Sequence, residues 1–368
     1  MTNLDIIAGA RPNFMKIAPI IHAIHKYNEH TDNPISYRLI HTGQHYDKAM
    51  SESFFQQLNI PEPHINLGAG GGSQAEQTSA IMTGYEKCLI QNIPELCIVV
   101  GDVTSTMACS IVAKKALIKV AHVEGGIRSN DITMPEEINR IVTDSITDYF
   151  FTTSEVANEN LKKGGIEEER IFFVGNTMID SLLSNLNWLQ ESAVFKDLQL
   201  ADKKYLVATL HRPANVDNPQ NLKALLNIID ESSHNHLVIF PMHPRTRKIF
   251  HSLNLNLRNI VVDEPLSYLE FIHLIKNSKG VITDSGGITE ETTVLNIPCI
   301  TLRDNTERPE TIQFGTNELV GTNPENIPPF IKKMINGNWK SGTIPKLWDG
   351  KTAERIVSII STLYEPHQ

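Results

Sequence analysis

Residues 96–124 read LCIVVGDVTSTMACSIVAKKALIKVAHVE, two short apolar runs separated by a longer segment. The runs at 96–100 and 119–123 are rich in valine and other apolar residues, as buried strands are. Residues 105–116 between them have the length and composition of a helix. A strand, a helix and a second strand in this order predict a βαβ unit with parallel strands.

The same alternation runs through the whole first half of the chain. Strands are predicted at residues 4–8, 36–41, 96–100, 119–123, 149–152 and 171–174. Helices are predicted at residues 15–27, 74–91, 105–116, 136–146 and 155–163. Continuous apolar strands that alternate with helices are typical of a parallel sheet covered by helices on both faces.

The second half repeats this rhythm. Its strands are predicted at residues 205–209, 236–241, 259–262, 280–283, 299–302 and 318–320. Two such sets predict an α/β protein with two Rossmann-like, doubly wound domains. We expect an N-terminal domain at residues 1–176, a polar connection at 177–204 and a C-terminal domain at 205–350. Residues 351–368 are expected to contain an amphipathic helix that packs back across the domains.

Composition narrows the classes of function. The chain has 368 residues, with 33 Lys and Arg against 42 Asp and Glu, and its net charge of -9 argues against a nucleic-acid-binding protein. A locally positive cleft for a small anionic ligand stays compatible with this balance. No apolar run approaches the roughly 18 residues of a membrane span, so no membrane partner is expected. No basic segment precedes an apolar one at the N-terminus, and we expect no secretory signal.

The cysteines and histidines show no metal-binding pattern. The four cysteines are Cys88, Cys97, Cys109 and Cys299. They form no C-x-x-C pair and each lies among apolar residues, so we expect buried thiols and a cytoplasmic location. No H-E-x-x-H or comparable set of three ligands occurs, and no G-x-G-x-x-G loop follows a strand. We therefore expect no metal and no nicotinamide cofactor.

Charged and polar residues follow the predicted strands, at the edge where open α/β sheets bind their ligands. They include Arg11, Asp102, Glu124, His211, His243 and Ser285. Loops are polar by default, so this enrichment alone does not establish a site. Lys16 adds a second cation near the start of a helix, where a bound anion is favoured and an unpaired cation is not. Two solvated charges are the alternative.

The densest cluster of charge lies at residues 122–140. It contains Glu124, Asp131, Glu136, Glu137, Arg128 and Arg140. Pro135 suits the first position of a helix, and we expect one of the two glutamates that follow it only to complement the helix dipole. Carboxylates in a closed cleft serve as general acid and base. An ion-pair network between the carboxylates and the two arginines is the structural alternative.

The most specific local signal is the segment 283–291, which reads TDSGGITEE. A serine and two glycines lie there between a strand and a helix, so their backbone N–H groups would point at a phosphate oxygen. Glu291, farther along this helix, could accept both hydroxyls of a ribose. Arg308 comes from the next loop. Together these residues predict a nucleoside-diphosphate site.

These segments together resemble the non-hydrolysing UDP-N-acetylglucosamine 2-epimerases over nearly the whole chain, from Gly9 to Gly321. The ordered motifs that carry the resemblance lie at residues 9–16, 42–45, 101–106, 122–128, 135–140, 211–215, 283–291 and 303–310. The resemblance implies a glycosyltransferase-B-like arrangement, in which two Rossmann-like domains face a cleft. It also implies a homodimer with a UDP-sugar substrate.

The resemblance further implies a role for each matching residue. Asp102, Glu124, Glu136 and His211 match the family's catalytic residues. The positions matched to the UDP-sugar are Arg11, Lys16, Arg140, His243, Ser285, Gly286, Gly287, Glu291 and Arg308. Gln44 and His45 match a region where several members bind a second, activating UDP-N-acetylglucosamine.

The reaction implied is reversible epimerisation at carbon 2 of UDP-N-acetylglucosamine, which gives UDP-N-acetylmannosamine for cell-surface polysaccharide. The hydrogen on carbon 2 is not next to a carbonyl, so UDP must leave before a carboxylate can remove it. A 2-acetamidoglucal is then the intermediate. Such chemistry requires a cationic grip on the departing diphosphate and a site that excludes water.

Other functions remain compatible with these residues. The chain departs from enterobacterial members at residues 13–14 and 213–214, which leaves open a modified sugar such as a diacetamido uronic acid. A retaining glycosyltransferase of the same fold would also bind a UDP-sugar but would not need the three carboxylates. A hydrolysing epimerase would release free N-acetylmannosamine. A nucleotide-sugar sensor would bind without turnover.

Overall fold

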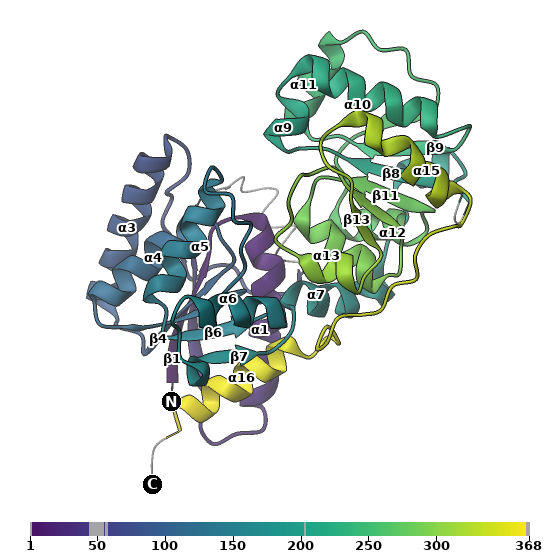
Figure 1. Cartoon of the computed structure of the whole chain (residues 1–368). Coiled ribbons are helices and arrows are strands. Elements are labelled where there is room, and N and C mark those ends of the chain that lie inside the picture. Colours follow the sequence, from purple (N-terminus) through teal and green to yellow (C-terminus); the bar gives the residue numbers. More distant parts are fainter. Residues whose placement is uncertain (1, 44–54, 56–57, 202–203, 366–368) are drawn as a thin grey trace. The chain divides into compact units, whose positions relative to one another are not determined.

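The computed structural model describes residues 2–43, 55, 58–201 and 204–365 (Figure 1). The chain divides into two compact units. The first comprises Met1–Ser181 and Lys346–Gln368, and the second comprises Leu182–Pro345. Each unit is built on a parallel sheet, which confirms the predicted fold class of two doubly wound α/β domains.

The sheet of the first unit has the strand order β3-β2-β1-β4-β5-β6-β7 among the described residues. These strands are β1 (Thr2–Ala8), β2 (Ile35–His41), β3 (Ile65–Asn66), β4 (Leu96–Val100), β5 (Lys119–Val123), β6 (Tyr149–Thr152) and β7 (Ile171–Phe173). All neighbouring strands pair in parallel. Six of them lie within two residues of their predicted bounds, and the two-residue β3 was not predicted.

Helices cover both faces of this sheet. They are α1 (Arg11–Asn28), α3 (Gln74–Gln91), α4 (Thr104–Lys115), α5 (Pro135–Ile146), α6 (Glu155–Lys163), α7 (Thr177–Asn185) and α16 (Thr352–Leu363), with a short 3-10 turn η1 (Glu168–Arg170). On one face, side chains of α3 and α4 such as Ile81, Tyr85 and Cys109 pack on Ile7 and Val99 of the strands. These buried contacts hold the carboxyl ends of β1, β4 and β5 in fixed positions.

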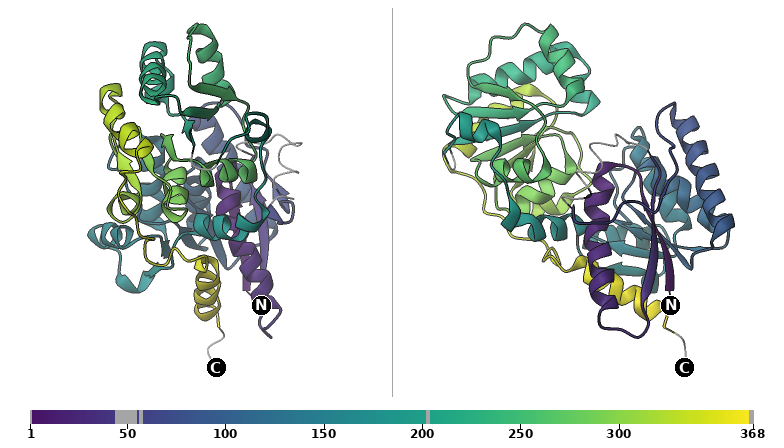
Figure 2. Two further views of the ribbon diagram at one scale, coloured as in Figure 1. Left: turned by 90° about the vertical axis from the view of Figure 1, so that its right-hand side faces the viewer. Right: turned by 180° about the vertical axis from the view of Figure 1, so that it is seen from behind.

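The last helix returns to the first unit. α16 lies against α1, as all views in Figures 1 and 2 show. The carboxylate of Asp180 accepts the backbone N–H groups of Thr352 and Ala353 at its start. Just before it, the indole N–H of the buried Trp348 donates to the carbonyl of Thr153. The sequence predicts a connection at 177–204 and a helix that crosses both domains, whereas here α7 runs through the unit boundary and α16 belongs to one unit.

The second unit has a sheet with the strand order β10-β9-β8-β11-β12-β13 among its described residues. These strands are β8 (Tyr205–Thr209), β9 (Leu237–Pro241), β10 (Ile260–Asp263), β11 (Gly280–Thr283), β12 (Cys299–Thr301) and β13 (Asn317–Leu319). Its helices are η2 (Leu186–Trp188), α8 (Ala193–Asp197), α9 (Pro213–Val216), α10 (Pro219–Ser232), α11 (Pro244–Ser252), α12 (Tyr268–Lys276), α13 (Gly286–Val294), α14 (Pro309–Gln313), η3 (Pro324–Asn326) and α15 (Ile327–Ile335). Two buried hydrophobic clusters lie on the two sides of the sheet.

Both sheets reverse their strand order at an equivalent place. In the first unit the chain moves outward from β1 to β2 and later continues on the other side at β4. In the second unit β8 lies in the same way between β9 and β11. Ligands of open α/β sheets bind outside the carboxyl ends of the strands at such a switch point. The loops after β1, β4, β8 and β11 are therefore the places to look for a site.

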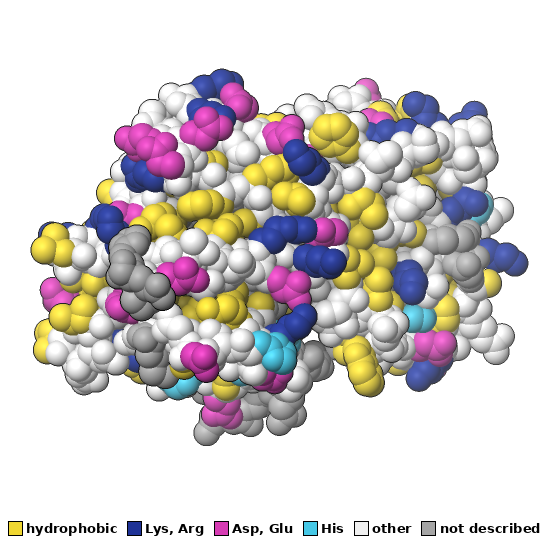
Figure 3. Space-filling model, turned by 90° about the horizontal axis from the view of Figure 1, so that it is seen from below, with side chains coloured by type: hydrophobic (Ala, Val, Ile, Leu, Met, Phe, Trp, Pro, Cys, Tyr) yellow, Lys and Arg dark blue, Asp and Glu magenta, His cyan; other side chains and the backbone are white. Residues whose placement is uncertain are grey.

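None of the described helices is both long and apolar enough to cross a membrane. All four cysteines are free and buried, as predicted, and burial raises the pKa of the Cys299 thiol to about 12. On the face shown in Figure 3, acidic, basic and hydrophobic side chains are interspersed.

Candidate active site

A buried ion pair lies at the switch point of the first sheet. Lys16 projects from α1, and Glu124 directly follows β5; Lys16 Nζ and Glu124 Oε2 are 2.7 Å apart. The side chains are 13% and 3% exposed. Gly101, after β4, lies against this pair, because a Cβ atom there would come within 3.2 Å of Lys16 Nζ. An internal carboxylate thus takes the place next to Lys16 where the sequence led us to expect a bound anion.

The backbone at Glu124 is strained. Its φ of 70° is in the left-handed region, which costs a residue with a side chain about 1–2 kcal/mol. Its N–H donates to the carbonyl of Phe151 and so keeps the residue at the end of the sheet. Strained backbone of this kind persists where the surrounding structure enforces it, and it clusters at functional sites.

A second buried cation, Arg140 of α5, holds Asp102. Arg140 Nη1 is 2.7 Å from Asp102 Oδ2, and Arg140 Nε is 2.9 Å from Glu137 Oε2. Glu137 also accepts the backbone N–H groups of Ser129 and Asn130, so this glutamate braces the loop before α5. Its neighbour Glu136 is partly exposed in the first turn of α5. One of the two glutamates is therefore structural, as expected, although it supports a loop and not the helix dipole.

Arg128 pairs with a carboxylate outside the ion-pair network that was the structural alternative. Its guanidinium lies 2.6 Å from Asp144, a buried residue of α5. Asp144 also accepts the backbone N–H of Gly126 and a bond of 2.7 Å from His122 Nδ1. Burial alone would raise the pKa of Asp144, but His122 and Arg128 hold it below its ordinary value.

His122 is fully buried and is used through both ring nitrogens. Nδ1 faces the Asp144 carboxylate, and Nε2 lies 2.7 Å from the carbonyl oxygen of Gly101. Both partners are acceptors, so the ring satisfies both bonds only when both nitrogens carry a proton. Through these hydrogen bonds, His122 and Asp144 link the loop after β4 to the loop after β5. Sequence reasoning missed this role, since His122 falls inside an apolar strand and Asp144 has no motif around it.

Asn13 connects the first loop to the middle of the sheet. Its side-chain oxygen accepts the backbone N–H groups of Gly9 and Ala10, and its Nδ2 donates to the carbonyl of Val100. The loop after β1 is thereby fixed to the end of β4. This position departs from the pattern of enterobacterial members, and the structure gives it a structural function.

In the second unit, the residue matched to the catalytic histidine rests on a buried carboxylate. His211 follows β8, and its Nδ1 lies 2.8 Å from Oδ1 of Asp284, which follows β11. The other strand-end histidine, His243, is exposed just before α11. Asp284 was recognised in the sequence only as part of the 283–291 motif, without a role.

The predicted phosphate-binding turn opens the helix α13. Ser285 is its N-cap, and its N–H donates to the Thr283 hydroxyl. Gly286 and Gly287 occupy the first turn, and a Cβ atom on Gly287 would meet nothing within 4 Å, so there is open space beside this residue. Unpaired N–H groups and the helix dipole make such a turn a ready anion site. Nearby, Arg308 forms an ion pair with the buried Glu290.

Glu291 lies one turn farther along α13 and is 4% exposed. Its Oε1 and the Tyr268 hydroxyl are both buried, and neither makes a well-aligned hydrogen bond among the described residues, although Tyr268 lies close enough to lower the pKa of Glu291. Burial raises the pKa of Glu291 to about 8, partly offset by Tyr268, and Glu290 raises it further. A buried polar atom without a partner is costly, and a ligand hydroxyl would satisfy it.

Three predicted site residues lie wholly or partly outside the described structure. Gln44 and His45 are not among the described residues, and the side chain of Arg11 is not described, although its backbone begins α1. Among the described residues, no three His, Cys, Asp or Glu side chains are grouped to hold a metal ion.

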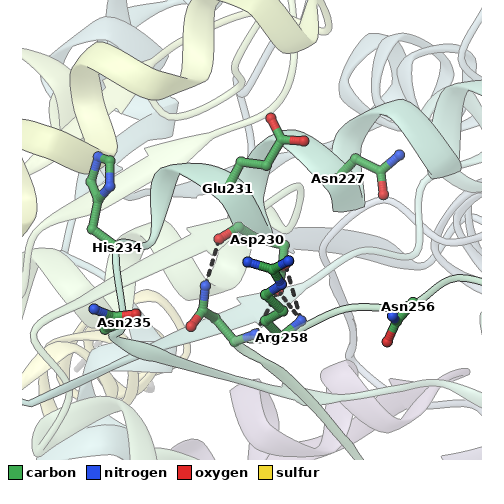
Figure 4. Close-up of a pocket in the computed structure, with 8 residues that line it drawn as sticks. Asn227, Asp230, Glu231, His234, Asn235, Asn256 and Arg258 are labelled. Carbon is green, nitrogen blue, oxygen red and sulfur yellow. Dashed lines mark hydrogen bonds between the residues drawn. The ribbon is translucent and has the colours of Figure 1, made fainter.

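A polar hollow of about 580 Å³ in the second unit lies away from these loops (Figure 4). It is at the amino ends of β9 and β10, opposite the edge where such sheets bind ligands. Its buried carboxylate, Asp230, accepts the backbone N–H groups of Arg258, Asn259 and Ile260. Asp230 is therefore used to fix the turn before β10.

Comparisons with known proteins identify the family of the chain. Residues 28–361 match the family described as UDP-N-acetylglucosamine 2-epimerase. The chain is 43% identical to UDP-N-acetylglucosamine 2-epimerase of Methanocaldococcus jannaschii over 97% of this chain and 98% of the relative. It is 39% identical to UDP-2,3-diacetamido-2,3-dideoxy-D-glucuronate 2-epimerase of Pseudomonas aeruginosa, over 86% of this chain and 87% of that relative.

The fold is also that of a solved enzyme. The crystal structure of the M. jannaschii UDP-GlcNAc 2-epimerase in complex with UDP-GlcNAc and UDP matches with a TM-score of 0.86, over 98% of this chain and 100% of that one. The family match and the identity extend over far more than half of the chain. The chain therefore belongs to the UDP-N-acetylglucosamine 2-epimerase family.

Proposed function

We propose that this enzyme reversibly converts UDP-N-acetylglucosamine into UDP-N-acetylmannosamine without hydrolysing it. The observation that carries the proposal is the buried Lys16–Glu124 pair at the switch point of the first sheet, on strained backbone and beside Gly101. Family membership supports the same reaction. A product of this kind would supply enzymes that assemble cell-surface polysaccharide.

The reaction separates into an elimination and an addition. The bond between carbon 1 and the diphosphate oxygen breaks, and its electron pair leaves with UDP. A carboxylate removes the proton on carbon 2, whose bonding pair forms the carbon 1–carbon 2 double bond of 2-acetamidoglucal. Return of a proton to the opposite face of carbon 2 and re-addition of UDP give the manno epimer. Carboxylates must therefore flank the sugar, and donors must stabilise the departing diphosphate.

In our proposal the first unit handles the sugar. Glu124 is nearly free of solvent, and Lys16 neutralises its charge, which makes it suited to proton transfer in a dry site. Asp102 is 34% exposed and keeps its position through Arg140. Glu136 starts α5, where the helix dipole favours its ionised form.

The second unit binds UDP in this proposal. The turn capped by Ser285 would take the diphosphate on the backbone N–H groups of Gly286 and Gly287. Glu291, whose buried Oε1 makes no well-aligned hydrogen bond among the described residues, would accept ribose hydroxyls. Arg308 and His243 add cationic or hydrogen-bonding groups around the same edge of the sheet.

Incubation of the purified enzyme with UDP-N-acetylglucosamine in deuterated water tests the function. We expect UDP-N-acetylmannosamine with deuterium at carbon 2, without acceptor, added metal or nicotinamide cofactor, as measured by NMR and chromatography. Free N-acetylmannosamine would indicate a hydrolysing enzyme instead. Binding without conversion would indicate a sensor, and turnover that requires an acceptor sugar would indicate a glycosyltransferase.

A modified sugar is the second candidate substrate. The 39% identity to the P. aeruginosa 2-epimerase of a diacetamido uronic acid favours it. The same assay with UDP-N-acetylglucosamine and UDP-2,3-diacetamido-2,3-dideoxyglucuronate in parallel decides between them. The substrate with the larger kcat/KM is the one to which the sugar side of the site is matched.

We expect UDP affinity to rise as the pH rises from 7 to 9 because of Glu291. Ribose hydroxyls donate to the carboxylate, so UDP binds the ionised form, whereas burial raises the pKa of free Glu291 to about 8. Binding at pH 7 therefore releases a proton, and the dissociation constant falls until the pH exceeds that pKa. Titration calorimetry in buffers of different ionisation enthalpy measures both quantities.

Glu291→Gln is the matched variant for this measurement. It keeps the size of the side chain and removes the titrating proton, so the pH dependence between 7 and 9 should vanish. Glu291→Ala should weaken UDP binding about ten- to a hundredfold, the scale of one charge-assisted hydrogen bond. Unchanged UDP affinity in Glu291→Ala would show that the ribose lies elsewhere.

Assembly, activation and location complete the proposal. We propose a homodimer; Ile90, Ile93 and Leu117, which are 80%, 70% and 92% exposed near the ends of α3 and α4, are apolar side chains that a second copy would cover. Binding of an activating UDP-sugar near Gln44 and His45 stays a prediction. Four buried, free thiols support a cytoplasmic location.

A further inference from the structure

Asp284 is fully buried and lies beneath His211 in the second unit. The two residues follow adjacent strands, β11 and β8, whose last residues Thr283 and Thr209 are register partners. Asp284 Oδ1 is 2.8 Å from His211 Nδ1, and the two side chains are 0% and 49% exposed. A dry carboxylate thus contacts one ring nitrogen of a histidine whose side chain is otherwise half exposed.

Donors from the same loop surround this carboxylate. The backbone N–H groups of His211 and Arg212 and the Nδ2 of Asn215 all point to Asp284. Burial alone would raise the pKa of Asp284, but the His211 side chain above all, with the donors from Asn215 and Arg212, holds it below its ordinary value. Asp284 is therefore ionised at neutral pH and acts only as an acceptor.

An acceptor at Nδ1 determines how the imidazole is protonated. Nδ1 must carry its proton to donate to Asp284, so in the neutral ring the lone pair is on Nε2. A carboxylate in this position both fixes the orientation of the ring and stabilises its charged form. The histidine–aspartate pair of the first unit, His122 with Asp144, is buried on both sides and differs because its Nε2 is engaged by the Gly101 carbonyl.

The chain sequence places this pair beside the turn that would bind the diphosphate. Asp284 directly precedes Ser285, the N-cap of α13. One strand end therefore supplies both the carboxylate that orients His211 and the backbone N–H groups of Gly286 and Gly287. Nε2 and these N–H groups belong to neighbouring strand ends of one sheet.

We propose that Asp284 is the positioning residue of His211, which it holds with Nδ1 protonated so that Nε2 interacts with the departing diphosphate of the UDP-sugar. This inference rests on the proposed function. As the carbon 1–oxygen bond breaks, its electron pair passes to the diphosphate oxygen, and Nε2 of the charged ring, in which both nitrogens carry a proton, donates a hydrogen bond to that oxygen. No proton has to leave the ring in this step, and no further reactant is needed.

Nitrogen NMR of the enzyme with ¹⁵N-labelled histidine tests the tautomer without substrate. The signal of His211 is assigned by its loss in His211→Asn. We expect Nδ1 of wild-type His211 to be protonated across the pH range in which the ring is neutral, with Nε2 as the unprotonated nitrogen. An Nε2-protonated neutral ring in the wild-type enzyme would overturn the proposal, and this result does not depend on the folding of any variant.

Asp284→Asn tests the consequence for the reaction. Turnover should fall about a hundredfold or more, as when an acid or base loses its orientation, whereas UDP affinity stays close to that of the wild type. The NMR signal of His211 should change at the same time. If Asp284→Asn instead lowers the melting temperature, the UDP affinity and the turnover in proportion, Asp284 serves only to hold the loop after β8 in place. This result would also overturn the proposal.

Asn215→Ala is the matched control. It removes a different side-chain donor to Asp284 and leaves the contact between Oδ1 and Nδ1 in place. Turnover should stay within a few-fold of the wild type, with an unchanged His211 signal.

The test also separates the two proposals. If the tautomer is as expected but no UDP-sugar is epimerised, the function is wrong; if epimerisation proceeds and Asp284→Asn has no effect, the positioning role is wrong.

Discussion

Glu124→Gln should lower epimer formation by about a hundredfold or more, the usual scale for a lost acid or base. Glutamine keeps the size of the side chain and can still accept a hydrogen bond from Lys16, so the local fold should persist. UDP affinity should also persist, because we assign UDP binding to the second unit. Initial rates, UDP titration and thermal melting of the same preparation measure the three quantities.

A buried ion pair elsewhere in the first unit provides the matched control. Arg38 Nε lies 2.7 Å from Asp5 in the middle of β1, with side chains 15% and 0% exposed. Asp5→Asn should lower the melting temperature and leave the turnover of the folded enzyme near normal. Comparison of Asp5→Asn with Glu124→Gln therefore separates the effect of neutralising a buried carboxylate from the effect of losing a reacting group.

The other two carboxylates are tested in the same way. Asp102→Asn and Glu136→Gln should also reduce turnover by about a hundredfold or more. Near-normal turnover in all three carboxylate variants would contradict the mechanism. A fall in melting temperature with a proportionate loss of UDP binding would favour the ion-pair alternative, for which Arg140 is the observed partner of Asp102.

Asp144→Ala should be the most destabilising single substitution that we predict. It removes the acceptor of His122, Arg128 and the N–H of Gly126, and leaves His122 buried beside one remaining acceptor. Breaking a buried ion pair from one side costs about 3–5 kcal/mol. For a unit of this size each kcal/mol shifts the melting temperature by about 2–4 °C. Calorimetry of the full chain measures the shift.

The effect should depend on pH in a defined direction. Asp144 has a pKa below its ordinary value in the fold, so its stabilisation is complete above the pKa of the unfolded chain, about 3.9. It is lost as the pH falls through the lower pKa of the folded state. Wild type and Asp144→Ala should therefore converge in stability under strong acid. A constant difference down to the lowest measurable pH would contradict this explanation.

Asp148→Ala, four residues along, is the control in which the cationic partners are partly exposed; it also removes the acceptor of the Val120 N–H. Asp148 pairs with Lys114 and Lys119, whose side chains are 32% and 56% exposed. Water can solvate these lysines once the carboxylate is gone, so the loss should be well below that of Asp144→Ala. Equal losses of stability in the two variants would indicate that burial of the charged partners does not determine the free energy lost when the carboxylate is removed.

The strands and most helices could be predicted because their hydrophobic pattern is local. Strands such as β4 are buried on both faces and therefore read as unbroken apolar runs. Helix α1 begins four residues before its predicted start. The difference arises because Asn13 caps the N–H groups of Gly9 and Ala10 from within the first turn, a contact that periodicity does not reveal.

The sequence selects candidate residues for the site but does not reveal the contacts between them. The rule that ligands bind at strand ends selected Glu124 and Asp102 directly. Their partners could not be assigned, because Lys16 and Glu124 are 108 positions apart and meet only through the order of β1, β4 and β5. Asp144 and Asp284 were passed over for the same reason, since only the fold shows which histidine each carboxylate contacts.

The return of α16 to the first unit has a consequence for synthesis on the ribosome. The second unit, Leu182–Pro345, is inserted between two segments of the first. Ile356, Val357 and Ile360 complete the packing of α16 on the first unit, yet they are made after the whole second unit. Domains usually fold in the order of their synthesis. Here the N-terminal segment is made first, but the apolar surface of α1 stays exposed until α16 has been synthesised. The inserted second unit can reach its native state before then.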